Sequence, residues 1–286
     1  MSEAKRDLLA LDELSPETIL LLLKRAQVMR DAWNARRMPQ ALTGRRVALV
    51  VDDGGWRNTT AFELGIKSMG GLCVSAPITL AGKEAVPDLA AFLDNWVDAI
   101  AIRTPDLEAL RKLAAVAYAP VINARTRVNH PCETLSDLAF LADLHGGLRP
   151  MKVVAVAPMA NILASWLEAA AVLPLEVVQV GPAHWHAPPA KNFRASTEMA
   201  ELHDADVIVT DCWPTGADVD ELLAWQVSGA ALDGTAAVFL PCPPVTRGQE
   251  VSADAMTHPR CRVVEAKAWL LHAQNAVLEW CLNPAP

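Results

Sequence analysis

The sequence predicts an α/β protein with two doubly wound domains, each built on a parallel sheet. Short apolar runs of strand length alternate with longer helical patterns along most of the chain, as is typical of parallel βαβ units. The alternation pauses at Gly146, Gly147 and Pro150, where one series of runs ends and a second begins. The length of 286 residues and the hydrophobic content of 52% suffice for two cores of ordinary size.

The first domain is expected to cover residues 1–140 and to hold four βα repeats. Each repeat begins with a run rich in Val, Ile, Leu or Ala that is long enough for a buried strand. The predicted strands are residues 46–51, 72–77, 98–102 and 120–123. An amphipathic stretch over residues 132–145 then leads toward the second domain.

The second domain, expected over residues 141–268, repeats the same plan. Its predicted strands are residues 152–156, 175–180, 206–210, 237–240 and 262–264. The last helix, over residues 269–282, has no strand after it and is expected to pack back on the first domain. Ligands of open parallel sheets bind beyond the carboxyl ends of the strands, so a cleft between the two domains is the expected active site.

The composition excludes several classes of protein. A net charge of -8 without a stripe of Lys and Arg argues against nucleic acid as a partner, and no apolar run is long enough to span a membrane. The first residues lack the basic and apolar pattern of an export signal, and the six cysteines are scattered singly. We therefore expect reduced thiols, a cytoplasmic location and a small-molecule ligand.

The sequence gives little support for a metal site or for a nicotinamide-binding site. His184 and His186 have a spacing that two metal ligands can use, but a third ligand is not evident and the surrounding prolines mark a loop. The pattern G-x-G-x-x-G follows none of the predicted strands, which argues against a nicotinamide dehydrogenase. The family resemblance described below likewise implies neither a metal nor an organic cofactor.

A strand, loop and helix over residues 42–65 form a candidate anion site. Asn58, Thr59 or Thr60 can cap the helix. The free N–H groups at its start, together with Arg57, would suit a phosphate group. Such junctions are common at protein surfaces, so this observation alone does not identify a site.

The segment His-Pro-Cys-Glu-Thr-Leu-Ser-Asp at residues 130–137 points to one chemistry. It resembles the HP-C/T-Q-x-L-x-D signature of the aspartate and ornithine carbamoyltransferase family. The resemblance implies that His130 donates to the carbamoyl oxygen and so stabilises the negative charge that develops there. Glu133 stands where the family has Gln. It can accept from the carbamoyl NH2 group, but its carboxylate beside a phosphate costs energy unless it is protonated or paired.

The segment over residues 55–63 resembles the family's phosphate-binding loop, but it retains fewer of the residues that bind phosphate. Residues 55–63 are similar to the family's S-T-R-T-R-x-S-F-E, with Arg57, Phe62 and Glu63 retained. The replaced positions are Gly55, Trp56, Asn58 and Thr59. Arg103, after the third predicted strand, falls on a carbamoyl-contacting Arg of the family. The implied carbamoyl phosphate ligands are Arg57, Asn58, Thr59, Arg103, His130 and Glu133.

The second half resembles the family's amino-acid site. Asn161 and Ser165 match its G-D-x-x-N-v-x-x-S pattern, and residues 205–213 resemble the ornithine branch's a-D-v-v-y-T-D-v-W. The resemblance implies that Asp211 binds a substrate amino group. Pro-Thr-Gly at residues 214–216 replaces the covering S-M-G loop. The implied acceptor-binding residues are Asn161, Asp211, Thr215 and Cys242, and the implied catalytic residues are His130, Arg103 and Cys242.

The resemblance covers residues 42–282 and implies a carbamoyltransferase of arginine biosynthesis that acts on an ornithine-like amine. It also implies a homotrimer in which a neighbour's loop, around residues 79–83, completes each site. The alternative is a non-catalytic paralogue or a binder of another small ligand, because Thr59 and Leu270 replace two phosphate-binding Arg residues. Two lost charge-assisted contacts of about 1.5 to 3 kcal/mol each would weaken binding by roughly two to four powers of ten unless Arg125 or Arg127 compensates.

Overall fold

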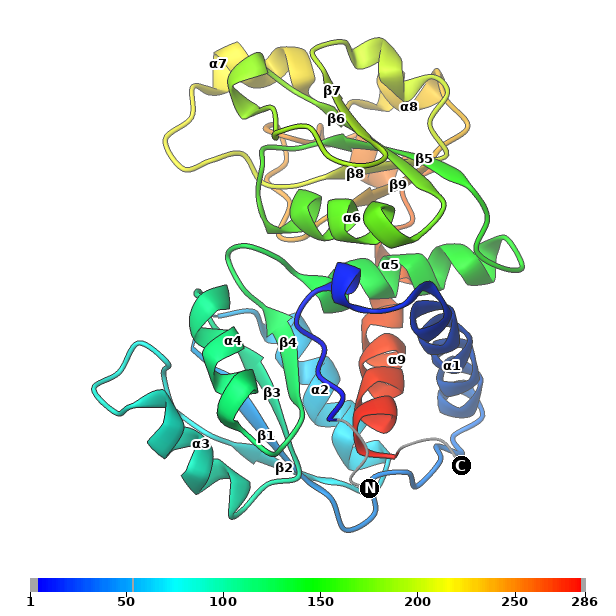
Figure 1. The fold of residues 1–286 in the computed structure, drawn as a ribbon. Helices are drawn as coiled ribbons and strands as arrows, with labels where there is room; N and C mark the ends of the chain where they lie inside the picture. Colours follow the sequence, from blue (N-terminus) through cyan, green and yellow to red (C-terminus); the bar gives the residue numbers. More distant parts are fainter. Residues whose placement is uncertain (1–4, 53, 284–286) are drawn as a thin grey trace. The chain divides into compact units, whose positions relative to one another are not determined.

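The computed structural model of the protein describes residues 5–52 and 54–283. The chain folds into two compact units. Unit 1 extends to Gly147 and resumes at Ala268, and unit 2 covers Leu148–Lys267. Each unit contains one parallel sheet with helices on its faces (Figure 1). The prediction of two doubly wound α/β domains is therefore confirmed as to the two parallel sheets.

The sheet of unit 1 has four parallel strands in the order β2-β1-β3-β4. Its strands are β1 (Arg46–Val51), β2 (Leu72–Ser75), β3 (Ala99–Arg103) and β4 (Val121–Arg125). The first four residues of β3, and of β4, are buried. Continuous apolar burial of this kind is what a sheet covered on both faces requires.

Helices cover both faces of this sheet (Figure 1). On one face α3 (Val86–Asp94) and α4 (Leu107–Val116) share a core with the inward side chains of β1 and β3. The helices placed elsewhere in unit 1 are α1 (Pro16–Asn34), α2 (Trp56–Ser68), α5 (Pro131–Leu144) and the part of α9 (Val263–Leu282) from Ala268 onward, with the short 3-10 helix η1 (Leu11–Glu13) before them.

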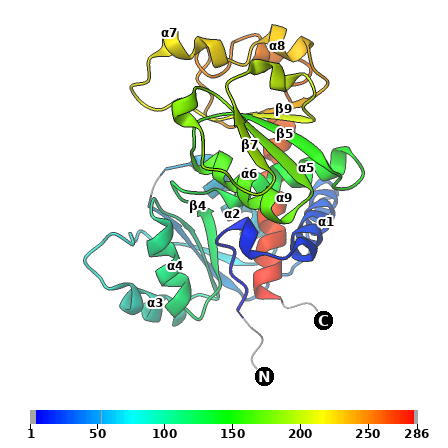
Figure 2. The same cartoon turned by 45° about the horizontal axis from the view of Figure 1, so that its top comes forward.

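Helices α2 and α9 approach closely in unit 1, as both ribbon views show (Figure 2). Gly65 of α2 makes this approach feasible, because a Cβ atom there would clash with the side-chain oxygen of Asn275. Near the start of α2, Gln274 Nε2 donates to the carbonyl of Asn58 at 3.5 Å. The contact anchors the beginning of α2, which is the part of the helix that faces the candidate anion site.

The sheet of unit 2 has five parallel strands in the order β7-β6-β5-β8-β9. They are β5 (Met151–Val156), β6 (Leu175–Val180), β7 (Phe193–Ser196), β8 (Val207–Thr210) and β9 (Val238–Pro241). The helices are α6 (Asn161–Val172), α7 (Val219–Leu222) and α8 (Gly229–Asp233), with 3-10 turns η2 (Ala183–Trp185), η3 (Met199–Leu202), η4 (Leu223–Trp225) and η5 (Ala255–Thr257). The side chains of one sheet face share a core with Leu202, Leu232 and Ala255.

Two sequence-based expectations about the elements are wrong, and one strand was missed. Residues 262–264 do not form a strand, because α9 begins at Val263 and Val264 is 79% exposed. The edge strand β7 was not predicted, since Phe-Arg-Ala-Ser lacks a strand-like apolar pattern. Helix α5 is not amphipathic: all residues from Pro131 to Ala142 are buried. Within residues 5–52 and 54–283, no helix combines the length and apolarity that a membrane span requires.

Candidate active site

The carboxyl ends of β1 and β3 are joined through Asp52. Its backbone N–H donates to the carbonyl of Arg103 at 2.9 Å. Its carboxylate accepts from the hydroxyl of Thr79 at 2.9 Å and from that of Thr104 at 3.3 Å. The sequence analysis did not single out Asp52, although an Asp directly after a buried strand is the available signal. It ties the loop around Thr79 to the same sheet edge as Arg103.

Helix α2 begins differently from the prediction. Its N-cap is Gly55, with φ 126° and ψ 62°, so none of the three predicted capping side chains caps it. Asn58 is 3% exposed, and its Nδ2 atom donates to the carbonyl of Ala124 at 3.1 Å. The hydroxyl of Thr59 donates to the carbonyl of Trp56 at 3.1 Å. Both side chains are thus directed at protein backbone. The first N–H groups of an α-helix have no partner within the helix, so the beginning of α2 can receive an anion.

Two arginines stand near the beginning of α2. The guanidinium of Arg57 lies over the ring of Trp56, with 5.0 Å between its Cζ atom and the ring centroid, and the indole is 68% exposed. Arg103 is the last residue of β3 and pairs with Val51 in the sheet register. Its guanidinium packs against Gly55. The structure therefore brings Arg103 and the N-terminus of α2 together.

His130 is the N-cap residue of α5 and is 7% exposed. Its Nε2 atom lies 3.7 Å from Oε2 of Glu133, which is equally buried. The sequence-predicted pair therefore forms one buried unit at the beginning of a helix. An acidic side chain in this first turn is favoured by the helix dipole.

A buried hydrogen-bond network holds the loop before His130. Nδ2 of Asn123 donates to Oδ1 of Asn129 at 2.8 Å, and Oγ1 of Thr126 lies 2.8 Å from the same oxygen. Asn123 and Asn129 both donate to the carbonyl of Leu9. The sequence reasoning missed these supporting residues. Three amide or hydroxyl side chains within seven positions after a buried strand were the signal that could have revealed them.

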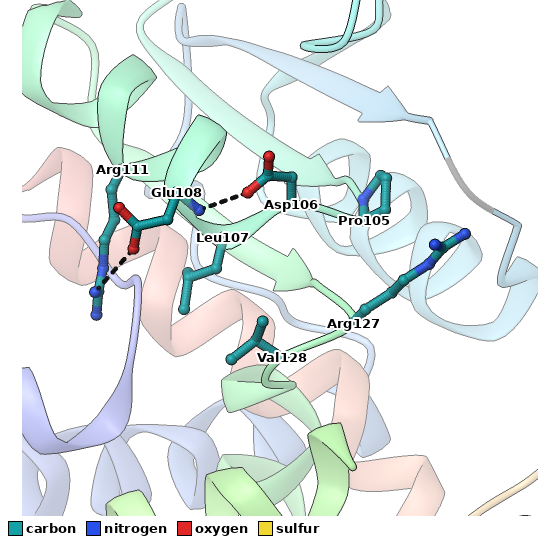
Figure 3. Close-up of a pocket in the computed structure, with 7 residues that line it drawn as sticks. All are labelled: Pro105, Asp106, Leu107, Glu108, Arg111, Arg127 and Val128. Atoms are coloured by element: carbon teal, nitrogen blue, oxygen red, sulfur yellow. Dashed lines mark hydrogen bonds and ion pairs between the residues drawn. The ribbon is translucent and has the colours of Figure 1, made fainter. Parts of the chain in front are cut away.

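The structure places Leu270, which replaces a phosphate-binding Arg of the family, and Arg127, which could compensate for that loss. Leu270, in place of a family Arg, is 3% exposed within α9. Arg127 borders an open hollow of about 580 Å³ in unit 1, and Figure 3 shows its guanidinium directed away from Leu107 and Val128 in that hollow. The lining residues are Pro105, Asp106, Leu107, Glu108, Arg111, Arg127 and Val128. The hollow is thus distinct from the predicted ligand set.

In unit 2 the predicted acceptor residues follow the ends of three neighbouring strands. Asn161 is the first residue of α6, after β5, and is 8% exposed. Asp211 and Cys242 directly follow β8 and β9, whose last residues Thr210 and Pro241 are register partners. Thr215 lies in the exposed turn after β8.

Negative charge collects around the end of β8. Burial raises the pKa of the Cys212 thiol to about 11, with further contributions from Asp211 and Glu250. Glu250 is itself buried, which raises its pKa, and it accepts a hydrogen bond from the N–H of Thr246 at 2.6 Å. Two carboxyl groups close to one edge of the sheet favour a cationic ligand there.

The residues 184 and 186 occupy the 3-10 turn η2 and its end, and His186 Nε2 lies 3.1 Å from the carbonyl of Gly181. In the described part of the chain, no three His, Cys, Asp or Glu side chains form a group that could hold a metal ion.

Comparisons with known proteins match both units to one family. The family description "Aspartate/ornithine carbamoyltransferase, carbamoyl-P binding domain" matches residues 6–143, and "Asp/Orn binding domain" of the same family matches residues 150–281. An ornithine carbamoyltransferase of Nitrobacter winogradskyi is 30% identical over 305 aligned positions that cover 99% of each chain. That of Acidothermus cellulolyticus is 31% identical, with 98% of this chain and 97% of the relative covered.

Solved structures show the same relationship. The ornithine carbamoyltransferase from Pyrococcus furiosus superposes with a TM-score of 0.92 at 27% identity, with 100% of both chains covered. The enzyme from Thermus thermophilus has a TM-score of 0.89 at 29% identity, with 97% of this chain and 99% of the other covered. The family matches over both units and the full-length relatives lead to one conclusion: this chain belongs to the aspartate/ornithine carbamoyltransferase family.

Proposed function

We propose that this protein transfers the carbamoyl group of carbamoyl phosphate to the amine of ornithine or a closely similar amino acid. The observation that carries the choice of acceptor is Asp211 at the end of β8, where the resemblance implies an amine-binding carboxylate. The relatives named ornithine carbamoyltransferases, which cover almost the whole chain, support the same reaction.

Unit 1 is proposed to bind the donor. Arg57 and the first N–H groups of α2 would receive the phosphate, and Arg103 and His130 would hold the carbamoyl oxygen. His130 and Arg103 thereby stabilise the charge that develops on this oxygen during attack. Glu133 is proposed to accept from the carbamoyl NH2 group. Asn58 and Thr59 stay in the proposed donor site, although their side chains donate to backbone carbonyls in this structure.

Unit 2 is proposed to bind the acceptor through Asn161, Asp211, Thr215 and Cys242. Asp211 orients the amine, which attacks in its neutral form. A C–N bond forms at the carbamoyl carbon, the C–O bond to phosphate breaks, and the departing phosphate takes the proton that the amine loses. The atoms of donor and acceptor account for both products, so the reaction as proposed uses no further reactant.

The proposal extends to assembly and setting. We infer a homotrimer whose active sites are shared through the loop around residues 79–83, a cytoplasmic location, and a role in arginine biosynthesis. The family resemblance supports the trimer and the pathway, and the singly scattered cysteines support a reducing compartment. Light scattering coupled to gel filtration tests the assembly: a mass of three chains is expected, and a monomer would contradict it.

The activity is tested by incubating the purified protein with carbamoyl phosphate and a panel of ornithine, lysine, aspartate and putrescine. We expect a ureido product and stoichiometric phosphate release with ornithine, and at least about tenfold lower kcat/KM with aspartate because Asp211 would repel its side-chain carboxylate. A well-folded protein that forms no ureido product from any of these amines would favour the alternative of a non-catalytic paralogue or a binder of another ligand.

A further inference from the structure

Gly55 and Arg103 are packed against each other at the beginning of α2. Gly55 has φ 126°, a backbone conformation that residues with a side chain rarely adopt. A Cβ atom built on Gly55 would lie 2.6 Å from Nη1 and 2.7 Å from Nε of Arg103, and closer still to Cζ. The guanidinium of Arg103 therefore occupies the space that any side chain at residue 55 would need.

The identity of the clashing atoms decides what a substitution would do. A guanidinium is the far end of a long side chain with several rotatable bonds. The backbone of β3 is paired with β1 on one side and with β4 on the other, where the register shifts between Ile102 and Arg103. A new Cβ atom would therefore displace the guanidinium and leave the strand in place. The effect would fall on the position of one charged group.

The location of this group matters because of its electrostatic surroundings. The N-terminus of α2 carries partial positive charge, which offers no attraction to a guanidinium. The sheet register places residue 103 beside residue 51, and the missing side chain of Gly55 leaves room for the guanidinium there. An anion that binds at the N-terminus of α2 would meet the guanidinium as well as the N–H groups.

We propose that Gly55 is a positioning residue: the absence of its side chain opens the space in which Arg103 lies, and it thereby sets the affinity for carbamoyl phosphate. This inference rests on the proposed function. The family has Ser at this position, so the device belongs to this chain. The family has an Arg where this chain has Thr59, so the phosphate loop has lost a positive charge. Gly55 compensates in part, because it lets the guanidinium of Arg103 lie directly against the N-terminus of α2.

The test is the replacement of Gly55 by Ser, the family residue, and by Ala. We expect the KM for carbamoyl phosphate to rise about tenfold, which corresponds to the loss of one charge-assisted contact of roughly 1.5 kcal/mol, while the KM for ornithine changes less than about twofold. A rise in both KM values, or in neither, would overturn the proposal.

Two control variants separate positioning from backbone strain. Gly44→Ala introduces a side chain at φ 77°, and no atom of the described residues lies within 4 Å of the new Cβ, so it reports the cost of the conformation alone. Gly54→Ala changes the residue next to Gly55, and its Cβ likewise meets no atom of residues 5–52 and 54–283 within 4 Å. We expect both to keep the KM for carbamoyl phosphate within about twofold of wild type, since neither displaces Arg103. An increase equal to that of Gly55→Ser in either control would contradict the proposal.

A double-mutant cycle with Arg103→Ala gives the sharpest readout, because residues in contact are expected to couple. If Gly55 acts through Arg103, then Gly55→Ser will leave the KM of the Arg103→Ala variant unchanged. Additive effects of the two substitutions would show that Gly55 acts by another route.

Crystal structures of wild type and of Gly55→Ser decide the inference even if the proposed reaction fails. A wild-type protein that neither binds nor turns over carbamoyl phosphate refutes the proposed function. The geometric part of the inference then stands if the Arg103 guanidinium is displaced in Gly55→Ser, and it falls if the guanidinium keeps its position.

Discussion

The two units use their strand ends in different ways. In unit 1 several polar side chains at the carboxyl edge are occupied with the protein itself: Asn58 donates to Ala124, and Asp52 accepts from Thr79. In unit 2 Asp211 and Cys242 stand directly after two paired strands, and the sheet register alone places them side by side. Unit 1 thus contributes to the proposed site from the end of β3 and the beginnings of α2 and α5. Unit 2 contributes mainly from the residues that follow β8 and β9, with Asn161 at the beginning of α6.

This difference affects how a substitution acts in each unit. A group at a helix start depends on loop conformation, as the packing of Arg103 on Gly55 at the beginning of α2 illustrates. A group at a strand end has one available direction for a given register. We therefore expect a substitution in unit 1 to change the affinity for the donor by moving neighbouring side chains as well. A substitution in unit 2 should change the affinity for the acceptor only through the residue that is replaced.

The largest effect is expected for Arg103→Ala. Removal of one preorganised donor to a developing oxyanion typically costs about 2.7 to 4 kcal/mol, so kcat/KM for carbamoyl phosphate should fall on the order of 10²- to 10³-fold. Arg111→Ala is the matched control, because that arginine pairs with Glu13 at the surface. Steady-state kinetics check both variants, and equal losses in the two would remove Arg103 from the site.

Acid should weaken unit 1 before unit 2. His272 of α9 is buried between Trp33 and Trp269, and burial followed by the nearby Arg30 lowers its pKa to about 4. The unfolded state then takes up a proton below about pH 6.5 that the folded state refuses. Stability should therefore fall by about 2 to 3 kcal/mol between pH 6.5 and pH 4.

In unit 2 the relevant group is Glu201. The hydrogen bond from Arg194 is the main cause that lowers its pKa to about 2, and Lys152 adds to it. Its stabilising contribution is complete above about pH 4.5 and is lost only as the pH falls toward 2. Urea unfolding at pH 7, 5.5 and 4.5 checks the contrast. The free energy of unfolding should fall less between pH 7 and pH 4.5 in His272→Phe than in wild type. His203→Phe, which removes an exposed histidine, should behave as wild type does. An equal dependence on pH in wild type and both variants would refute the assignment of the loss to His272.

A smaller effect is expected for Asp211→Asn. The substitution keeps the shape of the side chain and removes the charge that orients the amine, so the KM for ornithine should rise about 30-fold, near 2 kcal/mol, with little change in the KM for carbamoyl phosphate. Asp220→Asn, at an exposed position of α7, is the control. A change confined to the carbamoyl phosphate KM would reverse the assignment of the two halves.

The smallest effect is expected for Glu133→Gln, which restores the family residue. Removing a carboxylate near the bound phosphate should lower the KM for carbamoyl phosphate by about tenfold, or roughly 1.4 kcal/mol. Glu108→Gln provides the matched control, since it also lies in the first turn of a helix in unit 1. If Glu133→Gln instead weakens binding, the carboxylate of Glu133 itself contributes to the donor site.

Much of the fold was predictable because buried parallel strands must be apolar throughout. Strand β6 coincides with its predicted range, and β3 differs by one residue at each end. The edge strand β7 escaped prediction because a strand with few buried side chains carries no such pattern. Val263 and Val264 led to the prediction of a strand because both are β-branched, but they begin helix α9. At this helix start, Nε of Arg262 lies 2.7 Å from Oε1 of Glu265.

The types of residue at the site were predictable from the sequence, but the orientations and contacts of their side chains were not. Resemblance selected His130, Arg103 and Asp211, and each stands at the end of a strand or the beginning of a helix. The burial of Asn58 against Ala124 and the packing of Arg103 on Gly55 depend on tertiary contacts between distant segments. Local sequence preferences favoured Asn58, Thr59 or Thr60 as the helix cap, but the N-cap is Gly55, a glycine at positive φ.

The central claim is that unit 1 holds carbamoyl phosphate with Arg103 and His130 despite its thinned phosphate loop. Isothermal titration of carbamoyl phosphate into the folded wild-type protein tests it most directly. A dissociation constant below about 1 mM, raised at least about tenfold by Arg103→Ala, is the predicted result. An absence of binding heat at several times that concentration, in a protein that unfolds cooperatively, would contradict the account.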